Sequence, residues 1–257
     1  MHVCMSLLFV VVLYSGNGKK VDGLLICGLQ KTTLLDFPGH VACTIFTGGC
    51  NFRCPYCQNG ELVLNPAAQP SLSVEEVMAF LKKRKGILEG VCITGGEPTL
   101  QSDLEDFVRE VKNLGYLVKL DSNGYHPKAL KRLVEQGLLD YVAMDVKASK
   151  ANYARVTGVP NLDISRIEES VAFLMSQGQI PFEFRTTVVR GLHTLEEFEE
   201  IGKWLEGAPA LFLQCYQESG NVLNPAVPMG AFGKTELDCM AERARKYIVR
   251  VEIRGVE

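Results

Sequence analysis

Short apolar runs alternate with longer amphipathic stretches along most of the chain, and this alternation constrains the fold more than any other feature. Strands that are separated by helices pair in parallel through right-handed crossovers, because a parallel partner needs a connection of about a dozen residues or more. The runs expected to be strands are 41–47, 90–94, 116–120, 141–144, 182–189, 210–216 and 248–254. The stretches expected to be helices are 73–85, 102–114, the stretch that opens after Pro127, 164–177, 195–205 and 235–247. The pattern predicts an α/β fold whose six strand–helix units form a partial (β/α)6 barrel.

The composition is that of an ordinary globular protein. Of 257 residues, 47% are hydrophobic and 22% are charged, with a formal net charge of −3. These values exclude a disordered or collagen-like chain. The near-neutral charge, without a basic tract, argues against nucleic acid as a partner. No repeat, low-complexity segment or Pro/Gly linker marks a second domain, so residues 24–257 are expected to form one domain.

The first 23 residues are expected to be an extension of uncertain role, and an over-long start is an alternative for residues 1–20. Their apolar run, 5–14, is too short to span a bilayer core of ~30 Å as a helix. A signal peptide carries its positive charge before the apolar run, whereas the lysines here follow it. Lipoprotein processing at Cys27 would need a small residue where Ile26 stands. Neither export nor membrane attachment is therefore expected.

The chain has nine cysteines, three of which fall within eight residues. An odd number in a chain of this length fits poorly with a secreted disulfide framework and better with a reducing cytoplasm. The six single cysteines are expected to be small buried hydrophobes. They are Cys4, Cys27, Cys43, Cys92, Cys215 and Cys239.

The clustered cysteines are Cys50, Cys54 and Cys57, on a short loop that glycines flank. Thiolates suit zinc and iron–sulfur chemistry. A structural zinc site or a simple electron-transfer cluster takes four protein ligands, but no second C-x2-C pair or nearby histidine completes this set. Three thiolates would leave one iron of a four-iron cluster open to a substrate or cofactor. The alternatives are a zinc site with a distant fourth ligand and three unligated thiols.

Unusual polar groups stand at or just after the predicted carboxyl ends of five strands. They are the cysteine triplet, Gly95-Gly96-Glu97, Asp121-Ser122-Asn123, Asp145-Val146-Lys147 and the stretch from Gln214 to Gln217. The carboxyl ends of parallel strands meet on one face of a barrel, where such folds place their chemistry. The five groups are therefore expected to converge on one rim.

The three cysteines, the aromatic Tyr56 before the third of them, and the sequence Gly95-Gly96-Glu97-Pro98 resemble the radical S-adenosylmethionine (SAM) superfamily over residues 24–254. The resemblance implies a partial TIM-like barrel of the radical SAM type and a 4Fe-4S cluster whose open iron is chelated by SAM. One electron then cleaves SAM to methionine and a 5′-deoxyadenosyl radical, which abstracts a hydrogen atom. Cluster and SAM carry this chemistry, so no side chain is expected to be catalytic. The implied cluster ligands are Cys50, Cys54 and Cys57, and the implied cofactor contacts are Tyr56, Gln58, Gly95, Gly96, Glu97, Asp121, Ser122, Asp145, Lys147 and Gln217.

Some of these contacts have a physical rationale. The two glycines lack a Cβ, so their backbone could approach the methionine end of SAM, unless they only form a strand-to-helix turn. Asp145 and Lys147 are two apart on a strand and face one side, where they could hold ribose hydroxyls and a carboxylate. A solvated ion pair is the alternative. Asp121 with its two neighbours could bind the SAM amino group or a small cation, although Asn-Gly is also an ordinary turn.

Within the superfamily, the chain most resembles the glycyl-radical-enzyme activases. The segment LQKTTLLDFPG at 29–39, followed by FTGGCNFRCPYCQN, looks like the activating protein of anaerobic ribonucleoside-triphosphate reductase. The Asp-x-Lys at 145–147 and the strand around Arg185 are similar, more distantly, to pyruvate formate-lyase activase. The resemblance implies a glycyl radical enzyme as partner, most of all anaerobic ribonucleotide reductase, and a flavodoxin or ferredoxin as electron donor. Gln217 stands where formate-lyase activases carry a histidine, and it could bind adenine but cannot titrate.

Other functions stay open from the sequence. The chain could act on another glycyl radical enzyme of the formate-lyase type, or on a peptide or small molecule. A different class of function is a non-catalytic iron–sulfur or zinc module that passes electrons or bridges proteins. The sequence has no cysteine-rich insertion between Cys57 and Gly95, so a second cluster is not expected. His126 and His193 fall in predicted loops and are expected to face solvent.

Overall fold

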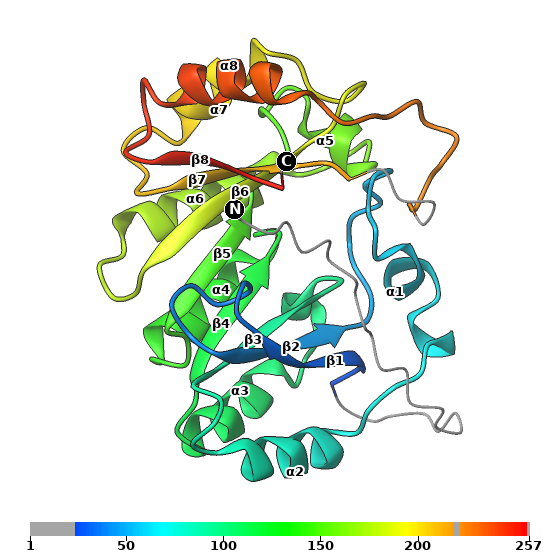
Figure 1. Ribbon diagram of the computed structural model, residues 1–257, viewed down its shortest axis with the longest axis vertical. Coiled ribbons are helices and arrows are strands. Elements are labelled where there is room, and N and C mark those ends of the chain that lie inside the picture. Colours follow the sequence, from blue (N-terminus) through cyan, green and yellow to red (C-terminus); the bar gives the residue numbers. More distant parts are fainter. Residues whose placement is uncertain (1–23, 218–221, 256–257) are drawn as a thin grey trace, which may run out of the picture.

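A computed structural model describes residues 24–217 and 222–255. The strands are β1 (Ile26–Thr33), β2 (Ala42–Thr47), β3 (Gly90–Gly95), β4 (Leu117–Ser122), β5 (Tyr141–Asp145), β6 (Phe182–Val188), β7 (Leu211–Cys215) and β8 (Val251–Arg254). The helices are α1 (Gly60–Leu64), α2 (Val74–Arg84), α3 (Leu104–Asn113), α4 (Pro127–Glu135), α5 (Tyr153–Thr157), α6 (Ile164–Ser176), α7 (Glu197–Trp204) and α8 (Lys234–Ala244), with 3-10 turns at Pro66–Ala68 and Pro98–Leu100. The strands form one curved sheet in chain order, with helices on its outer face (Figure 1).

The partial barrel that the alternation predicts is confirmed. β1 runs antiparallel to β2, and each later pair of neighbours is parallel. β1 and β8 are the two edges of the sheet, and no ladder joins them within the described ranges, so the barrel is open. All seven predicted strands are present, with ends that differ by three residues or fewer.

The sequence pattern misses β1, the antiparallel edge strand. Its register against β2 is interrupted between Ile26 and Gly28 and again between Gln30 and Thr33. Each interruption shifts the alternation of side chains, so the strand lacks the period of two that identifies a strand in a sequence. The pattern also misses α1 and α5, because five residues are too few for a helical period to show.

Helix α2 begins with the capping box that its sequence predicts. The Ser73 hydroxyl accepts a hydrogen bond from the Glu76 N–H at 3.2 Å, and the Glu76 carboxylate accepts one from the Ser73 N–H at 2.8 Å. The two bonds satisfy amide groups that a helix start leaves unpaired. The helix then buries Val77 and Leu81 against the sheet.

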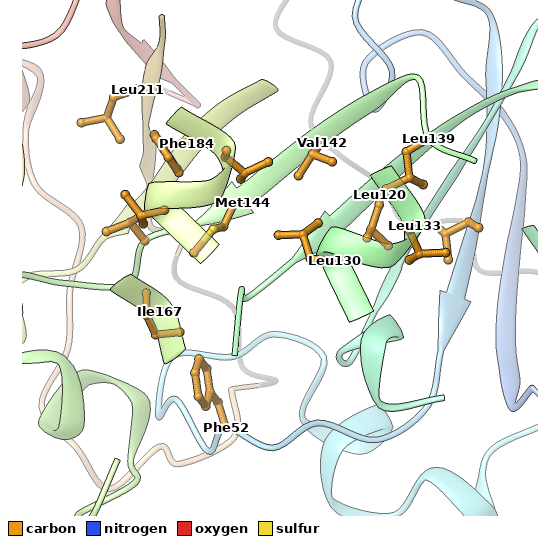
Figure 2. Close-up of a cluster of buried hydrophobic side chains, with 14 of the residues drawn as sticks. Phe52, Leu120, Leu130, Leu133, Leu139, Val142, Met144, Ile167, Phe184 and Leu211 are labelled. Atoms are coloured by element: carbon orange, nitrogen blue, oxygen red, sulfur yellow. The ribbon is translucent and has the colours of Figure 1, made fainter. Parts of the chain in front are cut away.

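The hydrophobic core lies between the outer face of the sheet and the helices. Every second residue along β4, β5 and β6 points outward, and Leu120, Val142 and Phe184 are fully buried there. Leu130 of α4 and Ile167 of α6 belong to the same cluster (Figure 2). Each large apolar side chain buried in this way contributes roughly 1.5–3 kcal/mol. This packing holds the carboxyl ends of the strands in fixed positions.

The inner face of the same strands is polar. Lys119 and Asp121 of β4, Asp145 of β5, and Glu183 and Arg185 of β6 alternate with the core residues of their strands. Buried charges are costly unless they are paired, and each of these side chains has a partner of opposite charge. The open barrel therefore encloses a charged interior.

Three of the single cysteines are buried as expected: Cys27, Cys43 and Cys92. Cys215 is only partly buried and Cys239 is exposed, which corrects the expectation for both. Cys239 is exposed because α8 turns its 237, 240 and 241 positions toward the core. Cys4 and the predicted extension lie outside the described residues. Among the residues described, no helix is long and apolar enough to cross a bilayer.

Candidate functional site

The cysteine loop connects β2 to α1 at the carboxyl end of β2 (Figure 1). The Arg53 N–H donates to the Thr157 carbonyl at 2.8 Å, which ties the loop to the end of α5. The Phe52 ring lies 5.6 Å from the Tyr125 ring and 6.4 Å from the Tyr153 ring, edge to face in both cases. Figure 2 shows Phe52 directed toward the buried cluster. The loop is thus anchored to the core between its first two cysteines.

Burial affects all three clustered thiols, although Cys54 is buried and Cys50 and Cys57 are only partly buried. Burial raises the pKa of Cys50 to about 12 and that of Cys54 to about 11, and it also raises the pKa of Cys57. A thiolate at Cys54 raises the pKa of Cys50 further, and one at Cys57 does the same to Cys54. The thiols therefore interact in pairs along the loop, Cys50 with Cys54 and Cys54 with Cys57.

Lys147 is the cation common to the three thiols. Its charge opposes the rise in the pKa of Cys50, Cys54 and Cys57. Its ammonium lies 2.9 Å from an oxygen of Asp145, just beyond the end of β5. The site thus holds a positive charge where three thiolates would gather.

The cysteine loop presents polar atoms that could contact a bound multi-iron cluster. Asn51 Nδ2 and the Tyr56 hydroxyl are buried without a hydrogen-bond partner, and both belong to this loop. In the described part of the chain, no three histidine, cysteine or acidic side chains are placed to hold one metal ion, as a zinc site would need. In a four-iron cluster each cysteine binds a different iron, so the sulfurs lie farther apart than around one ion. The unpaired polar atoms of the loop are free to contact such a group.

Loading the loop with iron and sulfide at pH 8 is expected to release about three protons per chain beyond the four that hydrosulfide loses when it enters the cluster. The raised pKa values keep Cys50, Cys54 and Cys57 protonated in the metal-free protein, whereas ligands of a cluster must be thiolates. Calorimetry of cluster assembly in buffers of different ionisation enthalpy measures this release. A release no larger than that from the hydrosulfide would contradict the expectation that the three thiols are protonated in the metal-free protein.

Gly95 and Gly96 lie where β3 meets the cysteine loop. Gly95 has φ +118°, and a Cβ there would overlap the Thr47 backbone. A Cβ on Gly96 would overlap the carbonyl oxygen of Gly49. The Gly96 N–H donates to the Thr47 carbonyl at 2.8 Å. Close packing against neighbouring backbone therefore explains why both positions need glycine. The approach of SAM to these glycines stays a proposal.

Replacing Gly96 by alanine is expected to destabilise the protein by roughly 1–3 kcal/mol, because overpacking forces backbone to move. Gly178→Ala is the matched control, since a Cβ there meets nothing within 4 Å. Urea denaturation of the metal-free variants measures both effects. Equal stability of the two variants would show that the cysteine loop can move to accommodate a Cβ at Gly96 without loss of folding free energy.

Glu97 is 1% exposed and joins the ends of β3 and β4. Its carboxylate accepts hydrogen bonds from the Asn123 N–H at 2.6 Å, the Ser122 hydroxyl at 2.9 Å and the Thr99 N–H at 3.1 Å. Burial raises the pKa of Glu97, and these donors oppose the rise. Glu97 and Ser122, two of the predicted cofactor contacts, therefore bind each other.

Asn123 connects Glu97 to the cysteine loop. Its side-chain amide donates to Asn51 Oδ1 at 2.9 Å and lies 3.8 Å from Cys50 Sγ. The rim group after β4 and the first cysteine are thus in contact, as the convergence of strand ends predicts.

A chain of buried and partly buried ion pairs crosses the inner face of β4, β5 and β6. Asp121 accepts hydrogen bonds from the Lys119 ammonium and, at 3.0 Å, from Arg185 Nη1. Arg185 Nε donates to Asp145 at 2.9 Å, and Lys147 binds the other oxygen of that carboxylate. Burial alone would raise the pKa of Asp145, but Arg185 and Lys147 outweigh it and lower the pKa to about 2. Asp145 and Lys147 bind each other, but as a partly buried pair and not a solvated one.

The sequence analysis misses Lys119 and Arg185 as members of the site. Both stand within a strand whose neighbours are apolar and buried, at positions that alternate with the core. A charged residue inside a buried parallel strand is unusual, and this was the signal available. Their partners could not be read from the sequence because they lie on other strands.

Gln58 and Gln217 lie at the exposed margin of the site. Gln58 Nε2 donates to the Gln217 carbonyl at 2.9 Å, and Gln217 Nε2 donates to the Gly255 carbonyl at 2.7 Å. The segment after β7 also holds the cysteine loop, because the Leu223 N–H donates to the Cys57 carbonyl at 2.9 Å. These bonds connect the loop after β2 with the loop after β7, across the open side of the barrel.

Comparisons with known proteins agree with this geometry. A family profile described as the Radical SAM superfamily matches residues 44–205. A protein of Methanocaldococcus jannaschii that is provisionally named a glycyl-radical enzyme activating enzyme is 29% identical over 238 residues, covering 90% of this chain and 96% of that protein. A second protein of the same organism, with the same provisional name, is 28% identical over 189 residues and covers 72% of this chain and 71% of its own.

A solved structure shares the fold. The crystal structure of Streptococcus suis SuiB bound to S-adenosylmethionine matches with a TM-score of 0.62 at 12% sequence identity. The match covers 80% of this chain and 48% of SuiB, so the chain spans about half the length of that protein.

Proposed function

Because the chain belongs to the radical SAM superfamily, whose enzymes use a 4Fe-4S cluster and S-adenosylmethionine, we propose that it is an activase that installs a glycyl radical on a partner enzyme. Anaerobic ribonucleoside-triphosphate reductase is the proposed partner. The placement of Cys50, Cys54 and Cys57 on one loop, with the charge of Lys147 acting on all three thiols, is the observation that carries the enzymatic part of this proposal. The names of the two archaeal relatives and the segment 29–39 support the activase part.

The side chains of this protein would bind, orient and shield the cofactors. The three cysteines would hold the cluster. Lys147 offsets their negative charge and, with Asp145, faces the position proposed for SAM. When bound, cluster and SAM together supply an adenosyl radical that removes a hydrogen atom from the substrate. The proposed cofactor contacts are Tyr56, Gln58, Gly95, Gly96, Glu97, Asp121, Ser122, Asp145, Lys147 and Gln217.

The paired charges of the barrel interior favour a neutral substrate group. Lys119, Lys147 and Arg185 each bind an aspartate, and Arg254 binds Glu183 at 3.1 Å. A polyanionic small molecule needs cations that are free to bind it, whereas the backbone of a peptide glycine does not. This pairing supports a peptide substrate over a phosphorylated small molecule.

The electron for SAM cleavage is proposed to come from a flavodoxin or ferredoxin in a reducing cytoplasm. The unpaired thiols of the described residues are compatible with such a compartment.

The test is to incubate the reconstituted protein with SAM, a reductant and anaerobic ribonucleotide reductase. A glycyl doublet in the electron paramagnetic resonance (EPR) spectrum of the partner is expected. Cleavage of SAM without the doublet would instead indicate another substrate, such as a formate-lyase type enzyme or a small molecule. One zinc per chain, or a cluster that ignores SAM, would indicate a non-catalytic module.

A further inference from the structure

His193 is a buried histidine that the proposed chemistry does not use directly. It lies between β6 and α7, and only 4% of its surface is exposed. The expectation that it faces solvent is therefore wrong. His126, the other loop histidine, is partly buried. The ring of His193 packs 6.2 Å from that of Phe198 in α7, so it is enclosed on the outer side as well.

The hydrogen-bond partners of His193 select one neutral tautomer. Its Nε2 lies 2.9 Å from the carbonyl oxygen of Lys147, which can only accept, so Nε2 carries the proton. Its Nδ1 accepts a hydrogen bond from the Val189 N–H at 3.1 Å. Nδ1 thus binds the residue that follows β6, and Nε2 binds the segment that follows β5.

A second contact holds the same segment two residues later. The Ser149 N–H donates to the buried Glu197 carboxylate of α7 at 2.8 Å, and Asn152 Nδ2 donates to it at 3.1 Å. The segment from Lys147 to Asn152 is therefore tied to the β6–α7 connection by His193, by Glu197 and by the Leu192 carbonyl, which accepts a hydrogen bond from Asn152 Nδ2 at 2.9 Å. Of these ties, only that from His193 reaches Lys147 itself.

We infer that His193 is a positioning residue that fixes the Lys147 backbone, and through it the ammonium that faces the three clustered thiols. The inference rests on the proposed function, in which those thiols hold the cluster. The Lys147 ammonium also depends on Asp145 and Arg185 for its direction. Those side chains direct the tip of Lys147, whereas His193 holds its backbone. Second contacts of this kind commonly change ligand affinity or activity 10- to 100-fold when they are removed.

The test compares three variants at this position. His193→Phe keeps the ring but removes both nitrogens. His193→Asn keeps a polar group near the Nδ1 position but is too short to reach Lys147. His193→Gln can still donate to the Lys147 carbonyl from its terminal amide. Tyr116→Phe is the control, because it removes another buried side chain-to-backbone bond, from Tyr116 to Leu81 at 2.8 Å, away from the site.

Two quantities are measured on each reconstituted variant, without the partner enzyme. They are the midpoint potential of the cluster and the KM for SAM in reductive SAM cleavage. A cation near a cluster favours its more negative, reduced form. We expect H193F and H193N to lower the potential and to raise the KM about tenfold, while H193Q and Y116F stay near the parent.

Unchanged potential and KM in both H193F and H193N would overturn the inference. So would equal shifts in Y116F, because the effect would then reflect general loss of stability. If H193F does not fold, the contrast between H193N and H193Q decides the question. A missing glycyl doublet would overturn the proposed activase function and leave this result standing, since neither measurement involves the partner.

Discussion

Serine in place of Cys50, Cys54 or Cys57 is expected to remove the cluster and lower reductive cleavage of SAM by roughly a thousandfold or more, because the cofactors carry the chemistry. Each cysteine supplies one of three thiolates, and the described loop offers no spare sulfur to replace it. Iron content, the visible spectrum and the rate of methionine formation measure the loss.

Two other cysteines provide matched controls. Cys43→Ala removes a fully buried thiol from β2, and Cys239→Ser removes an exposed one from α8. Both variants are expected to bind iron and cleave SAM as the parent does. Full cluster content in any of the three loop variants would show that the replaced cysteine is not a cluster ligand.

Replacing Arg185 by methionine is expected to destabilise the metal-free protein by ~3–5 kcal/mol, the usual cost of removing one partner of a buried ion pair. Arg185 is the partner that Asp121 and Asp145 share, at 3.0 Å and 2.9 Å. Without it, two buried carboxylates lose their strongest opposing charge. Urea denaturation at pH 7 measures the loss.

Arg190→Met is the control, because Arg190 makes an exposed ion pair with Glu236. Exposed pairs contribute ~0–1 kcal/mol. A loss from Arg185→Met as small as that from Arg190→Met would contradict the role of the buried network.

The effect of Arg185→Met is also expected to depend on pH. In the parent, Asp145 has a folded pKa of about 2, below its unfolded value. It therefore contributes stability at pH 7 that is lost as the pH falls toward 2. The variant lacks the part of that contribution that Arg185 supplies, so the difference between the two proteins should narrow from pH 7 to about pH 3. A difference that stays constant over this range would mean that packing, and not charge, explains the loss.

The sequence predicts the parts of the fold and site that depend on local pattern. Alternating strands and helices indicate a partial barrel, and the carboxyl ends of parallel strands necessarily share one rim. Residues as distant as Cys50 and Asn123 are therefore expected to meet, and they do. Ser73 and Glu76 could likewise be assigned from spacing alone, because a capping box lies within four residues.

The parts that depend on distant partners could not be predicted. Lys119 and Arg185 are single charges in apolar strands, and their function appears only when the strands are side by side. His193 was expected in solvent because a loop position says nothing about what covers it. Glu97 was expected to face the cofactor, whereas the structure shows it bound to the backbone and side chains of the next strand end.

The central claim is that three cysteines hold a four-iron cluster with one iron left for SAM. Mössbauer spectroscopy of the protein reconstituted with iron-57, recorded with and without SAM, tests it most directly. Four irons per chain are predicted, with one iron whose signal changes when SAM is added while the other three keep theirs. Four equivalent irons that do not respond to SAM, or a single bound zinc, would contradict the claim.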